Sequence, residues 1–290
     1  MIKERKYNEN NPANAQYHIP LIKIRNAIKK YIMSQPKLYK YYDFSFHKQE
    51  HDLDLLLDES IERVKNGKTY RSSKLIPKTT FNTAYQNFCK RGIMKNTYIE
   101  LLNMYFKKGP NRKLMYRHKD STCIVNKNGS DKVKYNGYKK RKVTNASIET
   151  DANGVVIHST LNDGNDHDSK IFQQDVKVDY FIDKDLLERF SKYYCADGGY
   201  DTKFIRDYLS NLDLIPIIKY NKKNTKDENK LKKLTLSKYN QKIYNKRFII
   251  EDTNGNIKSF KLVQTRMDRK SSNFESSLFI SYMNKVLRYI

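Results

Sequence analysis

The sequence predicts a three-layer α/β domain with a mixed sheet, preceded by a helical region. Up to about residue 110 the apolar residues follow a helical period, and from about residue 114 short β-type runs begin. The later elements follow in the order β-β-β-α-β-α-β-α, which is typical of a mixed sheet with helices on both faces. We therefore divide the chain into a helical, basic N-terminal region, residues 1–110, and an α/β domain, residues 111–290.

Three helices are expected in the second half of the N-terminal region. Residues 51–67 have acids in the first turn, a Leu/Ile/Val stripe and a closing glycine, as a capped helix should. Residues 75–93 and 97–110 form the other two. The helix within 75–93 is short and basic and lies between loops, so it suits a DNA-reading helix. A core helix with a solvated basic face fits the same pattern, and the sequence leaves both open.

The α/β domain begins with an expected antiparallel meander, whose last turn is the "DANG" at 151–154. The expected strands are 121–127, 140–150, 154–161, 193–197 and 214–220. The expected helices are 168–176, 183–193, 202–212, a stretch around 244–261, and 274–290. Residues 219–242 are rich in Lys and Asn and weakly patterned, which predicts a mobile basic loop.

The charge balance indicates a polyanionic partner. The chain carries 57 Lys and Arg against 32 Asp and Glu, a formal net charge of +25. No apolar run reaches the roughly 18 residues of a membrane span, and the first 20 residues lack the apolar core of a signal peptide. Three scattered cysteines are typical of a reduced, intracellular protein without a zinc site. We expect nucleic acid as the partner, an intracellular location and no membrane association.

The basic residues are concentrated in one segment. Residues 71–119 contain 12 Lys and Arg and a single acid, Glu100. An AT-rich genome would also enrich Lys, Asn, Tyr and Ile, so the clustering is more informative than the total. It is the footprint of a phosphate-contacting surface. Within it we take Lys90, Arg91 and Lys95 as candidate DNA-binding residues.

The stretch "YNKRFIIEDTNGNIKSFK" near the C-terminal end fits two shapes. Its Asn-Gly pair at 254–255 favours a β-hairpin. In a helix turning about 100° per residue, Tyr244, Arg247, Glu251 and Lys258 fall within an arc of roughly 60°, opposite an apolar face. The run "FIIE" does not alternate, so it suits a strand poorly. We predict a helix.

Three acids stand at the edges of the expected elements. Asp120 opens the first strand, Asp197 ends the fourth, and Glu251 lies on the helix just described. Each has an ordinary alternative role, as a strand-end, turn or solvated residue. Hard cations such as Mg²⁺ take carboxylate oxygens. We predict that the three carboxylates converge within metal-bridging reach.

These residues resemble a known family. Tyr244, Arg247, Glu251 and Lys258 match, in every spacing, the Tyr-Arg-Glu-Lys signature of cut-and-paste insertion-sequence transposases with a DDE catalytic triad. "YYCADGGYDTKFIRDYL" resembles the stretch around the second Asp of that family, "HKDSTCIV" the first, and "LNDGNDHDSKIF" its Gly-Asn-x-His-Asp loop. The resemblance covers residues 75–290. It implies an RNase H-like fold, which agrees with the element order.

The resemblance also implies a mechanism. Asp120, Asp197 and Glu251 would be the catalytic residues and would hold two Mg²⁺ (or Mn²⁺) ions for strand cleavage and strand transfer. Arg247 and Lys258 would grip phosphates near the cut. The substrate would be double-stranded DNA, as element ends and target, bound by a homodimer assembled on it.

Three side chains near these motifs keep two interpretations each. Tyr244 suits stacking on a splayed base or ordinary helix packing. His167 and Asp168 suit support of the carboxylates or a cap for the helix that starts at Ser169.

The sequence departs from the family pattern in places. Gly198 replaces a basic residue, Lys119 replaces an apolar one, and Thr253, Asn254 and Gly255 replace aromatic residues after the Glu. Two alternative functions therefore stay open: a catalytically decayed transposase-derived DNA-binding protein, and a metal-dependent nuclease without strand transfer.

Overall fold

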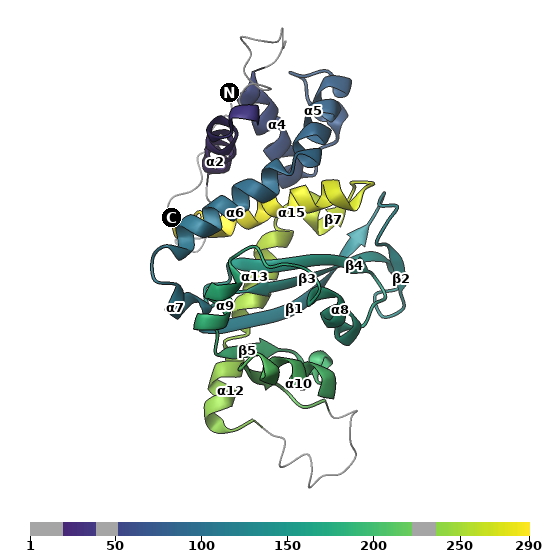
Figure 1. The fold of residues 1–290 in the computed structure, drawn as a ribbon. Coiled ribbons are helices and arrows are strands. Elements are labelled where there is room, and N and C mark those ends of the chain that lie inside the picture. The colour runs from purple at the N-terminus through teal and green to yellow at the C-terminus, as the bar shows by residue number, and fades with distance from the viewer. Residues whose placement is uncertain (1–19, 39–51, 222–235) are drawn as a thin grey trace, which may run out of the picture.

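The computed structural model describes residues 20–38, 52–221 and 236–290. Helices form the N-terminal part, a sheet lies in the middle, and further helices cover both faces of the sheet (Figure 1). Most of the expected mobile basic loop, residues 222–235 of 219–242, lies outside the described residues. The N-terminal helices are α2 (Leu21–Ser34), α4 (Leu53–Asn66), α5 (Lys78–Lys90), α6 (Ile93–Phe106) and α7 (Pro110–Leu114), with a 3-10 turn at Tyr70–Ser72.

The sheet is mixed, as predicted. β1, β3 and β4 form an antiparallel meander, and β5 and β6 extend it parallel to β1. The short strand β2 pairs with β3, and β7 pairs with β1. The strands are β1 (Tyr116–Asn126), β2 (Lys134–Asn136), β3 (Arg141–Thr150), β4 (Val156–Asp163), β5 (Tyr193–Ala196), β6 (Ile215–Ile218) and β7 (Thr265–Arg266).

Helices cover both faces of the parallel part of the sheet, because successive strand residues point to opposite sides. Tyr194 and Ala196 of β5 pack in one core with α8 and α10, whereas Tyr193 and Cys195 pack in another with α12. This three-layer arrangement confirms the RNase H-like α/β prediction. The later helices are α8 (Asp168–Asp175), α9 (Lys184–Phe190), α10 (Lys203–Asn211), α12 (Lys238–Asn245), α13 (Phe248–Lys258), α14 (Lys261–Gln264) and α15 (Ser271–Val286).

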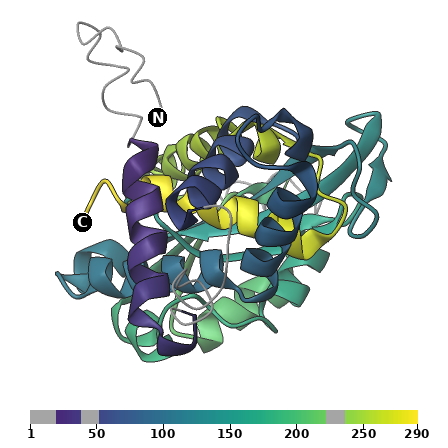
Figure 2. The ribbon, with the colours of Figure 1, turned by 90° about the horizontal axis from the view of Figure 1, so that it is seen from above.

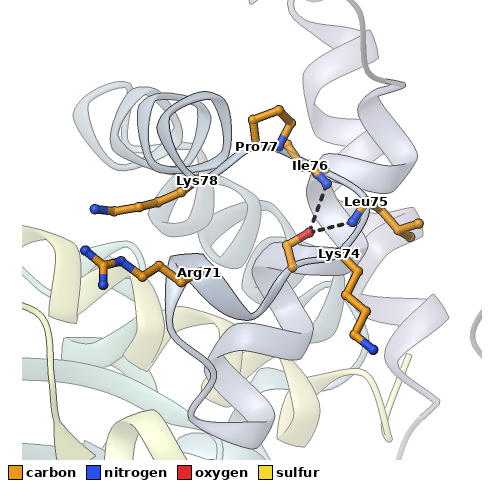
Figure 3. Close-up of a pocket in the computed structure, with 7 residues that line it drawn as sticks. Arg71, Lys74, Leu75, Ile76, Pro77 and Lys78 are labelled. Atoms are coloured by element: carbon orange, nitrogen blue, oxygen red, sulfur yellow. Dashed lines mark hydrogen bonds between the residues drawn. The ribbon is translucent and has the colours of Figure 1, made fainter.

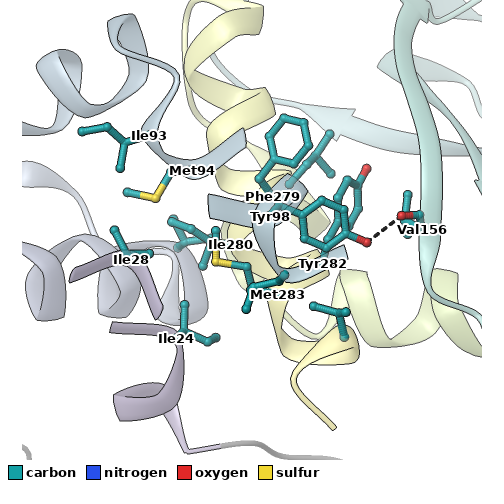
Figure 4. Packing of buried hydrophobic residues seen from close by; sticks show 14 of the residues in the cluster. Ile24, Ile28, Ile93, Met94, Tyr98, Val156, Phe279, Ile280, Tyr282 and Met283 are labelled. Carbon is teal, nitrogen blue, oxygen red and sulfur yellow. Dashed lines mark hydrogen bonds between the residues drawn. The ribbon is translucent and has the colours of Figure 1, made fainter. Parts of the chain in front are cut away.

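The N-terminal helices share one hydrophobic core with the C-terminal helix and the sheet. Seen from above, they lie over α15 (Figure 2). Tyr98 of α6 packs against Phe279 and Tyr282 of α15, and its hydroxyl donates to the Val156 carbonyl at 2.6 Å (Figure 4). The core is therefore continuous across residue 110, the boundary drawn from the sequence.

The stretch from Tyr244 to Lys258 is helical and not a hairpin. The sequence predicts one continuous helical stretch, whereas the structure has two separate helices, α12 and α13, joined at Lys246 and Arg247. At this junction the amides of Lys246, Arg247, Ile249 and Ile250 each donate to the carbonyl of the third residue before them. Gly255 lies inside α13 without the positive φ that a type I′ turn requires.

Gly255→Ala should raise the free energy of unfolding by up to about 1 kcal/mol, because alanine is the better helix former. An added Cβ meets no atom within 4 Å at this position. Gly154→Ala is the opposite case, since Gly154 has φ +78° and its Cβ would lie 2.5 Å from Thr253 Oγ1. Urea unfolding of both variants measures the difference. A loss of stability in the Gly255 variant would argue against the helix.

Candidate active site

Strand β1 sends its charged residues to two faces of the sheet. Lys119 points toward α8, where its Nζ lies 2.6 Å from Asp175 Oδ2. Ser121 follows on the same face and donates to Asp168 Oδ1 at 2.5 Å. Asp120, between them, points the other way and accepts a hydrogen bond from Asn254 Nδ2 of α13 at 3.0 Å. The alternation of the strand thus separates a buried ion pair from a carboxylate that faces α13.

Arg247 brings Asp120 and Asp197 into one cluster. Asp197 follows the last residue of β5, which lies beside β1 in parallel, so both carboxylates are at neighbouring strands. Arg247 Nη2 lies 3.9 Å from Asp120 Oδ1, and Nη1 lies 3.9 Å from Asp197 Oδ1. The Arg247 side chain is only 11% exposed, and Nη1 donates to the Tyr244 hydroxyl at 3.0 Å.

Asp120 is held in an unfavourable charged state. The pKa of its carboxyl is raised to about 6, chiefly by burial and with smaller contributions from the Asp168 and Asp197 charges, while Arg247 and the Ser121 amide act to lower it. Asp197 is more open, with 59% of its side chain exposed. The cluster therefore combines a partly buried carboxylate, with 23% of its side chain exposed, and a more accessible one.

Glu251 lies one turn after Arg247 on α13, on the same side of the helix by its spacing. Its side chain is exposed, and it forms no hydrogen bond or ion pair with any described residue. Asp252 points elsewhere and accepts from Lys285 Nζ of α15 at 2.9 Å. Within residues 20–38, 52–221 and 236–290, no three His, Cys, Asp or Glu side chains are grouped to hold a metal. The structure thus brings Asp120 and Asp197 together and leaves Glu251 apart.

Asn254 is a site residue that the sequence interpretation missed. In the sequence, the Asn254-Gly255 pair indicates a hairpin, or a departure from the family pattern. In the structure Asn254 is buried against Asp120, and its Oδ1 has no hydrogen-bond partner among the described atoms. Its position seven residues after Arg247 places it on the same helical face, which is the signal that would have found it.

Comparison with known proteins identifies the family. Residues 118–283, more than half of the chain, match the family described as the transposase DDE domain. The chain belongs to this family. It is also similar to a chain in a crystal structure of a pre-cleavage Mos1 transpososome, with 13% identity and a TM-score of 0.31 over 87% of this chain and 83% of that chain. No curated protein matches.

The matched DDE domain spans every predicted carboxylate, and its family is one of DNA-cleaving transposases that generally use divalent metal ions. The donor set fits such ions, since Asp120 and Asp197 offer hard carboxylate oxygens. The pKa of Asp120 is raised mainly by burial, and a divalent cation bound beside it would favour the charged carboxylate.

Tyr244 and Lys258, the other predicted residues near Glu251, are both at least partly buried. Tyr244 is buried in the core beneath β5 and β6, which matches the packing alternative. Lys258, half-buried at the end of α13, has its pKa lowered by burial and by Lys139.

His167 is the N-cap of α8 and accepts a hydrogen bond from the Ser169 amide at 3.4 Å. Asp168 instead contacts Ser121 and adds charge beside Asp120.

The predicted DNA-binding residues of the N-terminal region are at its surface. Lys90, Arg91 and Lys95 are exposed at the junction of α5 and α6. The opposite face of α5 is buried through Phe81, Tyr85 and Phe88, so α5 is a core helix with a basic outer end. A surface hollow before α5 adds further basic residues (Figure 3). It is lined by Arg71, Ser73, Lys74, Leu75, Ile76, Pro77 and Lys78.

No helix among the residues that the structure describes is long and apolar enough to cross a membrane.

Proposed function

We propose that this chain is a DNA transposase that cleaves DNA strands and joins the freed 3′ ends to target DNA, acting with divalent metal ions. The proposed catalytic and metal-binding residues are Asp120, Asp197 and Glu251. The observation that carries the proposal is the cluster in which Arg247, just before α13, contacts both Asp carboxylates, with Glu251 in the first turn of α13. The proposed partners are double-stranded DNA and a second copy of the chain assembled on it, inside the cell.

Each residue of the cluster has a distinct role in this proposal. Divalent ions, when bound, supply Lewis acidity that activates a water and stabilises the leaving 3′ oxygen. Asp120, which lies within β1 and not at its start, and Asp197, directly after β5, would bind the metal ions through their carboxylate oxygens. Asn254 orients Asp120 through its hydrogen bond, and Arg247 and Lys258 provide positive charge for phosphate groups on either side of the carboxylates.

A catalytically decayed DNA-binding protein is the second candidate. It is favoured by the exposed, unpartnered state of Glu251 among the described residues and by the replacement of the family's aromatic residues around Asn254. The two candidates share DNA binding and differ in metal-dependent strand cleavage. A nuclease that does not join the 3′ ends to target DNA is a third outcome of the same assay.

Asp120→Asn tests the proposal with a reading that is independent of cleavage. The folded-state pKa of Asp120, about 6, lies above its ordinary 3.8. Ionisation of this carboxyl therefore costs folding free energy above about pH 6, and the cost disappears as the pH falls toward 4. At pH 8 without metal, the Asn variant should gain about 1–3 kcal/mol in unfolding free energy.

Mg²⁺ should reverse the order of stability, so that the natural chain becomes more stable than Asp120→Asn. Added Mg²⁺ should raise the Tm of the natural chain and raise that of Asp120→Asn much less, because the variant lacks one of the three carboxylates proposed to bind the ion. Asp207→Asn, a control at an exposed carboxylate on α10, should follow the natural chain. Cleavage of supercoiled DNA should be lost in Asp120→Asn alone. Equal Mg²⁺ responses of the natural chain and this variant would refute metal binding at Asp120.

A further inference from the structure

The connection between β1 and β3 is a basic projection that the proposed chemistry does not use. Residues 127–142, here called the arm, include β2 and extend from the edge of the sheet (Figure 1). The arm carries seven Lys and Arg residues, all exposed, and one acid, Asp131. The basic residues are Lys127, Lys132, Lys134, Lys139, Lys140, Arg141 and Lys142.

The root of the arm is rigidly anchored. The Arg266 guanidinium is fully buried, and its Nη2 lies 2.5 Å from Asp131 Oδ1. Arg266 also donates to Thr144 Oγ1 of β3, and Asp131 accepts from the Ser271 hydroxyl at the start of α15. An added Cβ at Gly129 would lie 2.7 Å from Arg266 Nε, so the chain passes as close to this side chain as glycine allows. Asp131, the only acid of the arm, is thus paired with Arg266 and Ser271 at the root of the arm.

The tip of the arm presents an aromatic ring to solvent. Asn136 Oδ1 accepts from the Lys139 amide at 2.9 Å, and Asn136 Nδ2 donates to the Gly164 carbonyl at 2.8 Å. These bonds fix the turn that carries Tyr138, whose side chain is 89% exposed. The Lys139 ammonium lies 5.1 Å from the Tyr138 ring centroid. Because hydrogen bonds fix this turn, the exposed Tyr138 ring would lose little conformational entropy on binding. A ring in this position, surrounded by cations, is suited to stacking on a nucleotide base.

The arm follows directly on β1, the strand that carries Asp120 of the candidate active site. Lys139 and Lys258 both lower the pKa of the Cys123 thiol of β1, which burial raises. Lys139 lowers the pKa of the Lys258 ammonium, and Asp120 raises it. The Lys258 ammonium is thus influenced by both Lys139 of the arm and Asp120, and β1, which carries Asp120, leads directly into the arm. A surface hollow at the root, lined in part by Lys127, Lys134, Tyr135 and Lys142, widens this basic surface.

We propose that the arm is a DNA-binding element that holds the strand beside the cut, with its Lys and Arg residues on phosphates and Tyr138 stacked on an unpaired base. The inference rests on the proposed function, because the cluster at Asp120 fixes where the cut occurs. Phosphate contacts by exposed cations supply salt-dependent affinity without sequence preference. Stacking on a ring adds affinity for nucleotides that have no pairing partner.

The test compares arm variants of the full chain by fluorescence anisotropy. The probes are a blunt duplex and the same duplex with an unpaired 3′ overhang, titrated at several salt concentrations without divalent metal. Lys139→Gln/Arg141→Gln should lower the slope of log K against log salt by about 2 on both probes. Tyr138→Ala should weaken overhang binding about tenfold and blunt binding little, whereas Tyr138→Phe should bind normally.

Lys184→Gln/Lys203→Gln is the matched control, since it removes two exposed lysines from α9 and α10. It should leave both slopes unchanged. An unchanged slope in the arm pair, a Tyr138→Ala variant with normal overhang affinity, or a natural chain that binds neither probe would overturn the inference. Binding through the arm without Mg²⁺-dependent cleavage would uphold it while refuting the proposed transposase chemistry.

Discussion

Glu251→Gln is expected to abolish Mg²⁺-dependent strand cleavage while DNA binding is retained. The isosteric change removes one negative charge and keeps the shape of an exposed side chain, so the fold is unaffected. Metal-assisted stabilisation of a phosphoryl transition state is worth several kcal/mol, and about 1.4 kcal/mol corresponds to a tenfold rate. We expect cleavage to fall by about three orders of magnitude. Nicking of supercoiled DNA measures cleavage, and anisotropy measures binding.

Asp252→Asn is the control beside it. Asp252 pairs with Lys285 on α15, away from the carboxylate cluster, so its substitution should cost a little stability and leave cleavage intact. Normal cleavage by Glu251→Gln would remove Glu251 from the catalytic set. Because the structure leaves Glu251 apart from Asp120 and Asp197, that result would direct the search for a third ligand to Asp168, whose charge already acts on Asp120.

Helical period alone predicted that the residues around Glu251 form a helix. The phase of Arg247 and Glu251 follows from their spacing, and the structure confirms a helix there. The break before Arg247 was not predictable in the same way. Residues 244–258 have a continuous helical pattern, and the chain bends because Tyr244 packs beneath β5 and β6 while α13 packs on β1. Tertiary contacts made by distant strands decide such a junction.

The clustering of Lys and Arg in the sequence was a poorer guide to which of these residues are exposed. The basic composition of residues 71–119 predicts a phosphate-contacting surface, yet two of these basic residues are buried. Arg117 is buried with its Nε 2.6 Å from Glu149 Oε1, and Lys119 is buried against Asp175. Both partners lie more than 30 residues away, so the sequence gives no local sign of the pairs. Lys90 and Arg91 are exposed, as a DNA contact requires.

Arg63→Leu is expected to destabilise the whole chain by about 3–5 kcal/mol, because it leaves a buried carboxylate without its counter-charge. Arg63 Nη2 of α4 lies 2.6 Å from Asp268 Oδ1, and the two side chains are 4% and 2% exposed. The guanidinium carbon lies 4.3 Å from the Tyr70 ring centroid and 4.7 Å from that of Tyr85. After the substitution, the Ser277 hydroxyl would be the remaining donor to Asp268.

Urea unfolding followed by far- and near-ultraviolet circular dichroism measures this loss. The two signals should coincide in both proteins, because the core shared by α6, α15 and the sheet makes the N-terminal helices part of one cooperative unit. Lys29→Leu is the control, since the partly exposed Lys29–Asp54 pair between α2 and α4 should contribute at most about 1 kcal/mol. Arg63→Leu/Asp268→Leu should recover part of the loss by removing the stranded charge. An early transition confined to the N-terminal helices, or equal losses in the single and double variants, would show that this pair does not join the two regions.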